Sequence, residues 1–206
     1  VLKCYCKGRG NVVYYRQRGE TESFAEEGRN RMGKIISFVN QKGGVGKTTS
    51  AVNVAACLGV LGYRTLLIDL DPQGNATTGV KIAKKNLKYT VCDLLTGNIN
   101  AADAVIQTEY DKLWVMPANG RLANTEFELY NGEEPVFVMR KALESLKTVF
   151  DYIIVDCPPS LGMLTVNSLT ASDGVVVPMQ CEFYALEGLS QLSKTIRTVH
   201  DNYNST

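Results

Sequence analysis

The sequence predicts an α/β protein with a doubly wound, mainly parallel β-sheet flanked by helices. From residue 34 onward, short apolar runs typical of buried parallel strands alternate with longer segments of helical periodicity. Turns rich in Gly, Pro and Asp follow these apolar runs. The chain of 206 residues is 45% hydrophobic and 21% charged, which is enough apolar material for one packed core.

The alternation begins with Ile35–Val39, an apolar run that leads into a glycine-rich turn and predicts a buried strand. Thr48–Leu61 carries its apolar residues on one helical face and is stopped by Gly62. Arg64–Leu70 is the second predicted strand. Asp71–Gly74 closes that strand with the Pro and Gly of a turn.

The same pattern continues through the rest of the chain. Helices are predicted at Val91–Leu95, Ala101–Ile106, Pro135–Phe150, Leu161–Thr170 and Leu186–Val199. Strands are predicted at Leu113–Met116, Tyr152–Val155 and Gly174–Val177, each shortly before a proline. In such a sheet, ligands bind at the carboxyl ends of the strands, so the turns after Val39, Leu70 and Val155 are expected to converge on one site.

Residues 1–31 differ in composition, with scattered glycines and charges and no amphipathic period. We expect them to be a flexible N-terminal extension, and Met32 is a candidate natural start that would make them translated upstream sequence. Residues 32–206 are then the folded domain.

Charge, hydropathy and cysteine content argue against an overall basic protein, a membrane-spanning protein and a disulfide-bonded one. The net charge is +1, so DNA contact requires a local basic patch. No apolar run is long enough to span a membrane and no signal-peptide core is present, which predicts a cytoplasmic protein with no membrane partner. Six cysteines without a C-x-x-C pair, and one histidine, predict reduced thiols.

The strongest motif is the segment Asn40–Thr49, NQKGGVGKTT, between a predicted strand and a predicted helix. Glycines in such a loop let backbone N–H groups point at phosphate oxygens, and the following helix adds its positive end. The lysine of GKT places a cation against the β- and γ-phosphates, and the next hydroxyl can ligate Mg²⁺. The predicted nucleotide-binding residues are Gly43, Gly44, Val45, Gly46, Lys47, Thr48 and Thr49.

This loop departs from the common pattern G-x-x-x-x-G-K-[ST]. Gln41 stands where the first glycine is usual, and an extra lysine, Lys42, follows it. A lysine at this place is the mark of the deviant Walker A group of P-loop proteins.

Two further motifs follow strands. Asp69 and Asp71 leave the end of one strand with a single residue between them, so both side chains are expected to point the same way. A carboxylate there can orient the water that attacks the γ-phosphate. Asp156 ends the apolar run Tyr152–Val155, which is the Walker B arrangement for holding Mg²⁺.

Together these motifs resemble the ParA/Soj-type DNA-partitioning ATPases. The resemblance runs from Met32 to about Val199 and includes KGGVGKTT, DLDPQGNAT, DCPPSLG and VPMQCEFYALEGLSQL. The last two segments favour the partitioning branch over the related division-site ATPase MinD. Members of this family usually continue further, so the resemblance also implies that this chain lacks the usual C-terminal part.

The resemblance implies a cycle and a set of roles. ATP and Mg²⁺ bind between two subunits, with Lys42 reaching the partner subunit's nucleotide. Asp71 positions the hydrolytic water, and Thr48 and Asp156 serve the metal. The ATP-bound homodimer binds DNA without sequence preference, which makes the protein nucleoid-associated, and a ParB-type centromere-binding partner stimulates hydrolysis.

Other interpretations stay open at this level. They are a MinD-like membrane-associated regulator, an electron carrier similar to nitrogenase reductase, and a nucleotide-binding fragment without activity. Chromosome and plasmid cargo are equally compatible with the motifs. A basic run of Lys81, Lys84, Lys85 and Lys88 is expected to be a solvated surface, with DNA contact as the alternative.

Overall fold

The computed structural model describes residues 5–7, 11–13, 32–180 and 185–205. The chain divides into two compact units, Val1–Arg31 and Met32–Thr206. In the first unit, β1 (Tyr5–Lys7) pairs antiparallel with β2 (Asn11–Val13), a ladder that the sequence did not predict. The rest of the extension proposed for residues 1–31 lies outside the described residues.

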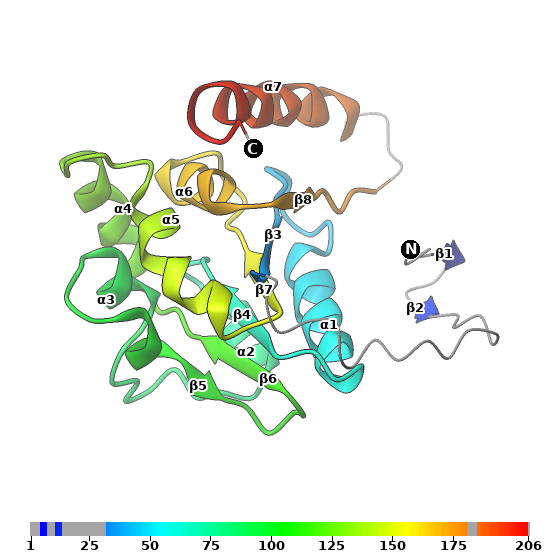
Figure 1. The fold of residues 1–206 in the computed structure, drawn as a ribbon. Coiled ribbons are helices and arrows are strands. Elements are labelled where there is room, and N and C mark those ends of the chain that lie inside the picture. Colours follow the sequence, from blue (N-terminus) through cyan, green and yellow to red (C-terminus); the bar gives the residue numbers. More distant parts are fainter. Residues whose placement is uncertain (1–4, 8–10, 14–31, 181–184, 206) are drawn as a thin grey trace. The chain divides into compact units, whose positions relative to one another are not determined.

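The second unit is built on a six-stranded sheet in the order β5-β6-β4-β7-β3-β8 (Figure 1). All neighbouring strands are parallel except β5, which runs antiparallel to β6. The strands are β3 (Lys34–Phe38), β4 (Thr65–Asp69), β5 (Ile106–Gln107), β6 (Leu113–Met116), β7 (Tyr152–Asp156) and β8 (Gly174–Val176). The predicted doubly wound, mainly parallel sheet is therefore confirmed.

Helices cover both faces of this sheet (Figure 1). On one face lie α1 (Lys47–Val60) and α2 (Asn75–Gly79). The opposite face carries α3 (Val91–Leu95), η1 (Ala101–Ala104), α4 (Leu122–Tyr130), α5 (Val138–Leu143), η2 (Glu144–Thr148), α6 (Met163–Ala171) and α7 (Ala185–Tyr203).

The central strands divide their side chains between the two faces because successive residues of a strand point in opposite directions. In β4, Leu67 packs in the cluster under α1, and Leu66 and Ile68 pack in the cluster under α3 to α7. In β7, Ile154 packs under α1 and its neighbours pack on the other side. Burial on both faces explains why these strands read as continuous apolar runs.

Two predicted helices differ from the structure. Pro135–Phe150 is not one helix: α5 begins only at Val138, and the chain tightens into the 3₁₀ turn η2 after Leu143. Ile106 is not helical but belongs to β5, because the extended Val105 ends η1 and turns the chain to pair with β6.

The sequence analysis also missed α2 and α4. Helix α2 is one short turn whose start depends on the left-handed Gly74. The buried residues of helix α4 are Leu122, Thr125 and Leu129. Because one of the three is polar, the hydrophobic periodicity of this helix is weak in the sequence.

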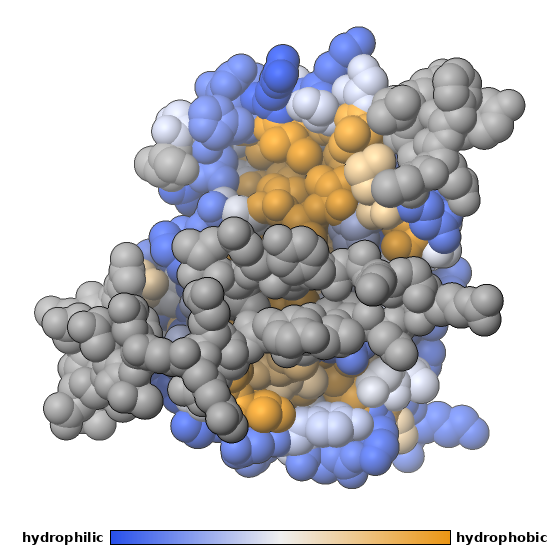
Figure 2. Space-filling model, turned by 90° about the vertical axis from the view of Figure 1, so that its right-hand side faces the viewer, coloured by the Kyte–Doolittle hydropathy of each residue, from blue (hydrophilic) through white to orange (hydrophobic). Residues whose placement is uncertain are grey.

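Strand β8 lies at one edge of the sheet. Figure 2, seen from the side toward which β8 points in Figure 1, shows a gathering of hydrophobic residues with hydrophilic ones above it. Val176 and Met179, in and just after β8, contribute to the exposed apolar surface. Within the described residues, no helix combines the length and the apolarity needed to cross a membrane.

Candidate functional site

The carboxyl ends of β3, β4 and β7 lie side by side, because these three strands are neighbours in the sheet. In the register, Asp156 at the end of β7 is level with Asp69 on one side and with Phe38 on the other. The segment 39–46 leaves β3 at this point and enters α1. The convergence expected after Val39, Leu70 and Val155 is therefore observed.

The glycine-rich loop owes its shape to two of its glycines. Gly44 and Gly46 have φ angles of 74° and 91°, which residues with a Cβ rarely adopt. Gly46 also forms the N-cap of α1, where no side chain caps the helix and no acidic residue stands in the first turn. The N–H groups of that turn thus lack side-chain acceptors and form an anion-binding end.

Gly43 is different, because its backbone is not left-handed and an added Cβ would meet nothing within 4 Å. The protein itself therefore does not require glycine at this position. A ligand approaching the backbone closely would require it.

Asn40 fixes the start of the loop. Its side-chain amide donates to the Pro178 carbonyl at 2.8 Å, and its side-chain oxygen accepts from the Lys42 backbone N–H at 3.0 Å. The loop is thereby tied to the segment that follows β8. The sequence analysis assigned Asn40 no role. Its contact with Lys42 is local, but nothing in the local sequence points to Pro178, which is far away in the chain.

Lys47 is buried, with 7% of its surface exposed, and its ammonium donates to the Lys42 carbonyl at 3.1 Å. Burial lowers the pKa of this ammonium, and the nearby Asp156 and Asp71 oppose that change. Lys42 and Thr49 are exposed, and Val45 and Thr48 are half-buried. The Lys47 ammonium lies beside the glycine-rich loop and near two carboxylates, and a cation in this place can bind phosphate oxygens.

Asp156 is fully buried, and neither of its carboxylate oxygens has a hydrogen-bond partner of normal geometry. Burial raises its pKa to about 7, helped by Asp69 and Asp71, while the Thr48 hydroxyl and the Lys47 ammonium favour the charged form. Buried carboxylate oxygens are nearly always satisfied in proteins, so the Asp156 carboxylate fits the water shell of a cation.

Asp69 and Asp71 have different environments. Asp69 is fully buried and accepts from the Thr77 N–H and hydroxyl, both at 2.7 Å, which ties β4 to α2. Asp71 retains some exposure and accepts from the Gln73 N–H at 2.8 Å. Asp69 is therefore a structural carboxylate, whereas Asp71 is close enough to Lys47 to oppose the lowering of its pKa by burial.

Cys157 follows Asp156 and is buried against a cluster of hydroxyl groups. Its thiol donates to Ser168 at 3.1 Å, and Ser37 bonds to both Ser168 and Ser172. Burial raises the pKa of Cys157 to about 12, so the thiol stays neutral. The described free thiols are Cys57, Cys92 and Cys157.

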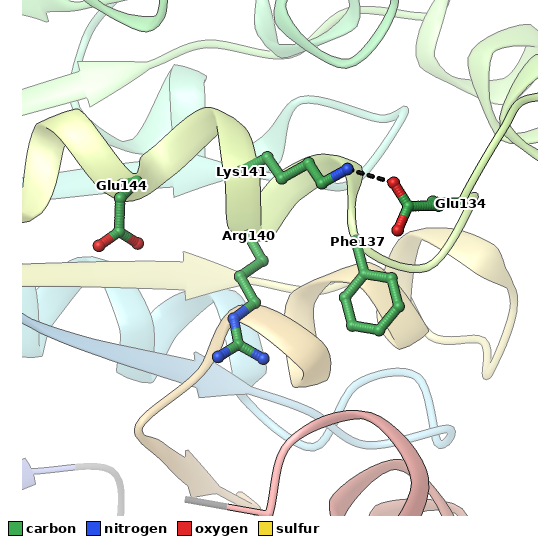
Figure 3. A pocket seen from close by; sticks show the side chains of 5 residues that line it. All are labelled: Glu134, Phe137, Arg140, Lys141 and Glu144. Atoms are coloured by element: carbon green, nitrogen blue, oxygen red, sulfur yellow. Dashed lines mark hydrogen bonds and ion pairs between the residues drawn. The ribbon is translucent and has the colours of Figure 1, made fainter.

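A hollow of about 490 Å³ lies elsewhere in the fold, on α5 and the loop before it (Figure 3). Figure 3 shows the Lys141 ammonium turned toward Glu134, with which it forms an ion pair. Arg140 donates to the Tyr203 carbonyl at 3.1 Å. These contacts join α5 to its preceding loop and to the end of α7, and none involves the glycine-rich loop.

Comparison with known proteins places this site in a family. A family model described as an AAA domain matches residues 33–206. The sporulation initiation inhibitor protein Soj of Bacillus subtilis is 52% identical over 174 residues, 84% of this chain and 69% of that protein. The chromosome partitioning protein ParA of Myxococcus xanthus is 46% identical over 200 residues, 97% of this chain and 68% of that protein.

Solved structures show the same fold. A cobyrinic acid a,c-diamide synthase from Mycobacterium smegmatis, with bound ATP analog and magnesium, has a TM-score of 0.80 at 39% identity over 84% of this chain and 70% of that one. A plasmid partition protein from Borrelia burgdorferi has a TM-score of 0.73 at 30% identity over 82% and 75%. The glycine loop, the strand-terminal carboxylates and the identity to Soj and ParA together show that this chain belongs to the ParA/Soj family of chromosome-partitioning P-loop ATPases.

Proposed function

We propose that this chain is a Mg²⁺-dependent ATPase that partitions DNA as a nucleotide-bridged homodimer. The observation that carries the proposal is Asp156, a buried carboxylate whose oxygens have no hydrogen-bond partner of normal geometry. It lies within electrostatic reach of Lys47 and Thr48, where β7 ends and α1 begins. This is the arrangement that a metal-bound nucleotide triphosphate needs.

The phosphate chain of ATP would lie on the loop Gly43–Gly46 and the first turn of α1. The backbone N–H groups there, including that of Val45, would donate to phosphate oxygens, with Thr48 and Thr49 continuing the cradle. Lys47 would leave the Lys42 carbonyl and neutralise the β- and γ-phosphates. The open space at Gly43 and Gly44 supports a close approach of the ligand to the backbone.

The Thr48 hydroxyl and the Asp156 carboxylate would serve Mg²⁺. Both are oxygen ligands, which this ion prefers, and Mg²⁺ usually keeps several waters and takes few protein ligands. Bound magnesium supplies charge neutralisation on the phosphates. Asp156 would then contribute an acceptor for the metal's water shell, which would satisfy its carboxylate oxygens.

Asp71 and Lys42 are the proposed catalytic residues. Asp71 is held by the Gln73 N–H and lies near Lys47, and it would accept a hydrogen bond from the attacking water. The exposed Lys42 would reach the nucleotide of a second subunit, so hydrolysis would require dimerisation, as it does with an arginine finger supplied in trans.

The ATP-bound dimer would bind DNA through phosphate contacts, independent of sequence and weakened by salt. Pairing two subunits doubles these contacts, so ATP can switch DNA affinity through avidity. A ParB-type partner would accelerate hydrolysis and release the DNA. This cycle implies a cytoplasmic, nucleoid-associated protein, with chromosome or plasmid as cargo, and the family relationship to Soj and ParA supports it.

Two alternatives make different predictions. A MinD-like membrane ATPase would require nucleotide-dependent binding to lipid and not to DNA. A nucleotide-binding unit without turnover would bind ATP but release no phosphate. The test is ATP hydrolysis with Mg²⁺, with and without duplex DNA, on this chain, on Lys47→Ala and on a control at an exposed lysine, Lys85→Ala.

We expect slow hydrolysis that rises with DNA, is unchanged in Lys85→Ala, and falls on the order of a hundredfold in Lys47→Ala because a phosphate-neutralising group is lost. Nucleotide binding without hydrolysis in any condition would contradict the ATPase proposal. Hydrolysis that responds to anionic lipid vesicles and not to DNA would favour the MinD-like alternative.

A further inference from the structure

The loop that carries Asp71 is held by two of its own N–H groups. The Gln73 N–H donates to the Asp71 carboxylate at 2.8 Å, and the Gly74 N–H donates to the Asp71 carbonyl at 2.9 Å. The direction of the Asp71 side chain therefore depends on the orientation of the peptide units on either side of Gln73.

A distant lysine holds one of these peptide units. The Lys84 ammonium donates to the Gln73 carbonyl at 2.7 Å. That carbonyl and the Gly74 N–H belong to the same planar peptide group. A rotation of this group that broke the bond from Lys84 to the Gln73 carbonyl would also move the Gly74 N–H away from the Asp71 carbonyl. The two hydrogen bonds are therefore coupled.

The stem of Lys84 adds a second restraint. Gly74 is left-handed, with φ of 64°, and a Cβ at this position would lie 2.7 Å from Lys84 Cδ and 2.9 Å from the Ala118 carbonyl. The lysine stem thus packs directly on Gly74. Its ammonium and its methylenes both confine the turn that ends in Gly74.

The other lysines of this basic run have different contacts. Lys81 forms an ion pair with Glu109 and lies 5.8 Å from the ring centre of Tyr110. Lys88 lies 4.9 Å from the ring centre of Tyr89. Lys85 is exposed beside Lys84. These lysines are not interchangeable, and Lys84 is the one that bonds to the Asp71 loop.

We propose that Lys84 is a positioning residue for hydrolysis, which holds the Gln73–Gly74 peptide so that Asp71 keeps the direction needed to orient water. The inference rests on the role proposed above for Asp71. It predicts an effect on turnover and not on nucleotide affinity, because Lys84 bonds to the Asp71 turn and not to the phosphate loop.

The test compares Lys84→Met, which keeps the apolar stem but loses the donor, with Lys84→Arg, which keeps a donor, and with Lys85→Met as the matched control. Steady-state kinetics give kcat and KM for ATP, and titration gives ATP affinity. Thermal unfolding and NMR-detected amide exchange at Gln73 and Gly74 are measured on the same ligand-free proteins.

We expect kcat to fall about fivefold in Lys84→Met, the effect of one hydrogen bond of ordinary strength. KM, ATP affinity and the thermal midpoint should not change. Lys84→Arg should restore kcat, and Lys85→Met should behave as the parent chain. Exchange at Gly74 should become faster in Lys84→Met alone.

Unchanged kcat in Lys84→Met would overturn the proposal, as would an equal loss of kcat, affinity and thermal midpoint, which marks a merely structural contact. If the parent chain hydrolyses no ATP, the proposed function fails by itself. Amide exchange then still decides whether Lys84 holds the loop, because unchanged exchange at Gly74 in Lys84→Met would refute that contact.

Discussion

At the scale of single residues, the site contains groups whose burial is costly without a ligand. Asp156 has no hydrogen-bond partner for either oxygen, and its pKa rises to about 7 from an ordinary value of 3.8. Lys47 is buried with its pKa lowered, although two carboxylates lie near it. Both residues are expected to be more stable in their charged forms once phosphate and metal are bound, since unpaired charges are expensive inside a protein.

The raised pKa of Asp156 predicts how stability depends on pH. Below pH 3.8 the carboxyl is protonated in both folded and unfolded states and has no effect. Between 3.8 and about 7 the unfolded chain releases the proton while the folded chain retains it, so the free energy of unfolding falls as pH rises. Above pH 7 the carboxyl is ionised in both states, and the loss in free energy of unfolding that Asp156 causes stays constant, on the order of 4 kcal/mol.

Asp156→Asn should therefore unfold at higher urea concentration than the parent chain at pH 8, in the absence of nucleotide, and at about the same concentration at pH 4. Asp69 also has a raised pKa, because of burial, and keeps part of the pH dependence in both proteins. The exposed Asp111→Asn is the control and should change little. Equal stability of Asp156→Asn and the parent chain at pH 8 would show that Asp156 carries no such penalty.

At the scale of elements, α1 is positioned by close backbone contact as well as by its apolar face. Gly59, in its last turn, is buried, and a Cβ there would lie 2.3 Å from the Asp111 carbonyl in the turn before β6. A carbonyl of the main chain cannot move aside as a side-chain end can. The helix therefore needs glycine here although alanine has the higher helix propensity.

We predict that Gly59→Ala lowers the free energy of unfolding by about 2 kcal/mol, the usual cost of overpacking. Gly188→Ala in α7 is the matched control, because a Cβ there meets nothing within 4 Å. This substitution should raise the free energy of unfolding by about 0.5–1 kcal/mol. Urea unfolding with a constant slope measures both. If the two variants were equally stable, the contact between α1 and the turn at Asp111 would be looser than described.

At the scale of the whole molecule, the proposed cycle depends on two copies meeting across the nucleotide. With Mg²⁺ and a non-hydrolysable ATP analogue, the chain should sediment as a dimer, and without nucleotide as a monomer. Lys42→Ala should weaken dimerisation by at least about tenfold, since a charge-assisted contact to phosphate is lost. Lys85→Ala should dimerise as the parent chain does.

Sedimentation velocity over a range of protein concentrations decides between these outcomes. ATP binding must be measured in parallel, so that loss of the dimer is not confused with loss of nucleotide. A Lys42→Ala chain that binds the analogue and still dimerises normally would contradict the role of Lys42 in trans.

The sequence by itself determined the sheet, the order of most elements and the place of the site. This was possible because buried parallel strands need continuous apolar runs, and because a phosphate loop needs glycine, lysine and hydroxyl residues at adjacent positions in one strand–loop–helix segment. The strands β6, β7 and β8 and the helices α1 and α3 lie where periodicity and turn residues placed them, within a residue or so at each end.

Only the tertiary structure decided which hydrogen-bond partners each motif residue has. Asp69 and Asp71 follow the same strand in the sequence, yet Asp69 accepts hydrogen bonds from Thr77 and Asp71 accepts one from Gln73. The contacts of Asn40 with Pro178 and of Lys84 with Gln73 join segments that the fold brings together. The helices α2 and α4 were missed for a related reason, because their stability comes from such contacts more than from local propensity. Sequence periodicity reports only which face of an element is buried, whereas hydrogen-bond partners distant in the chain are chosen by packing.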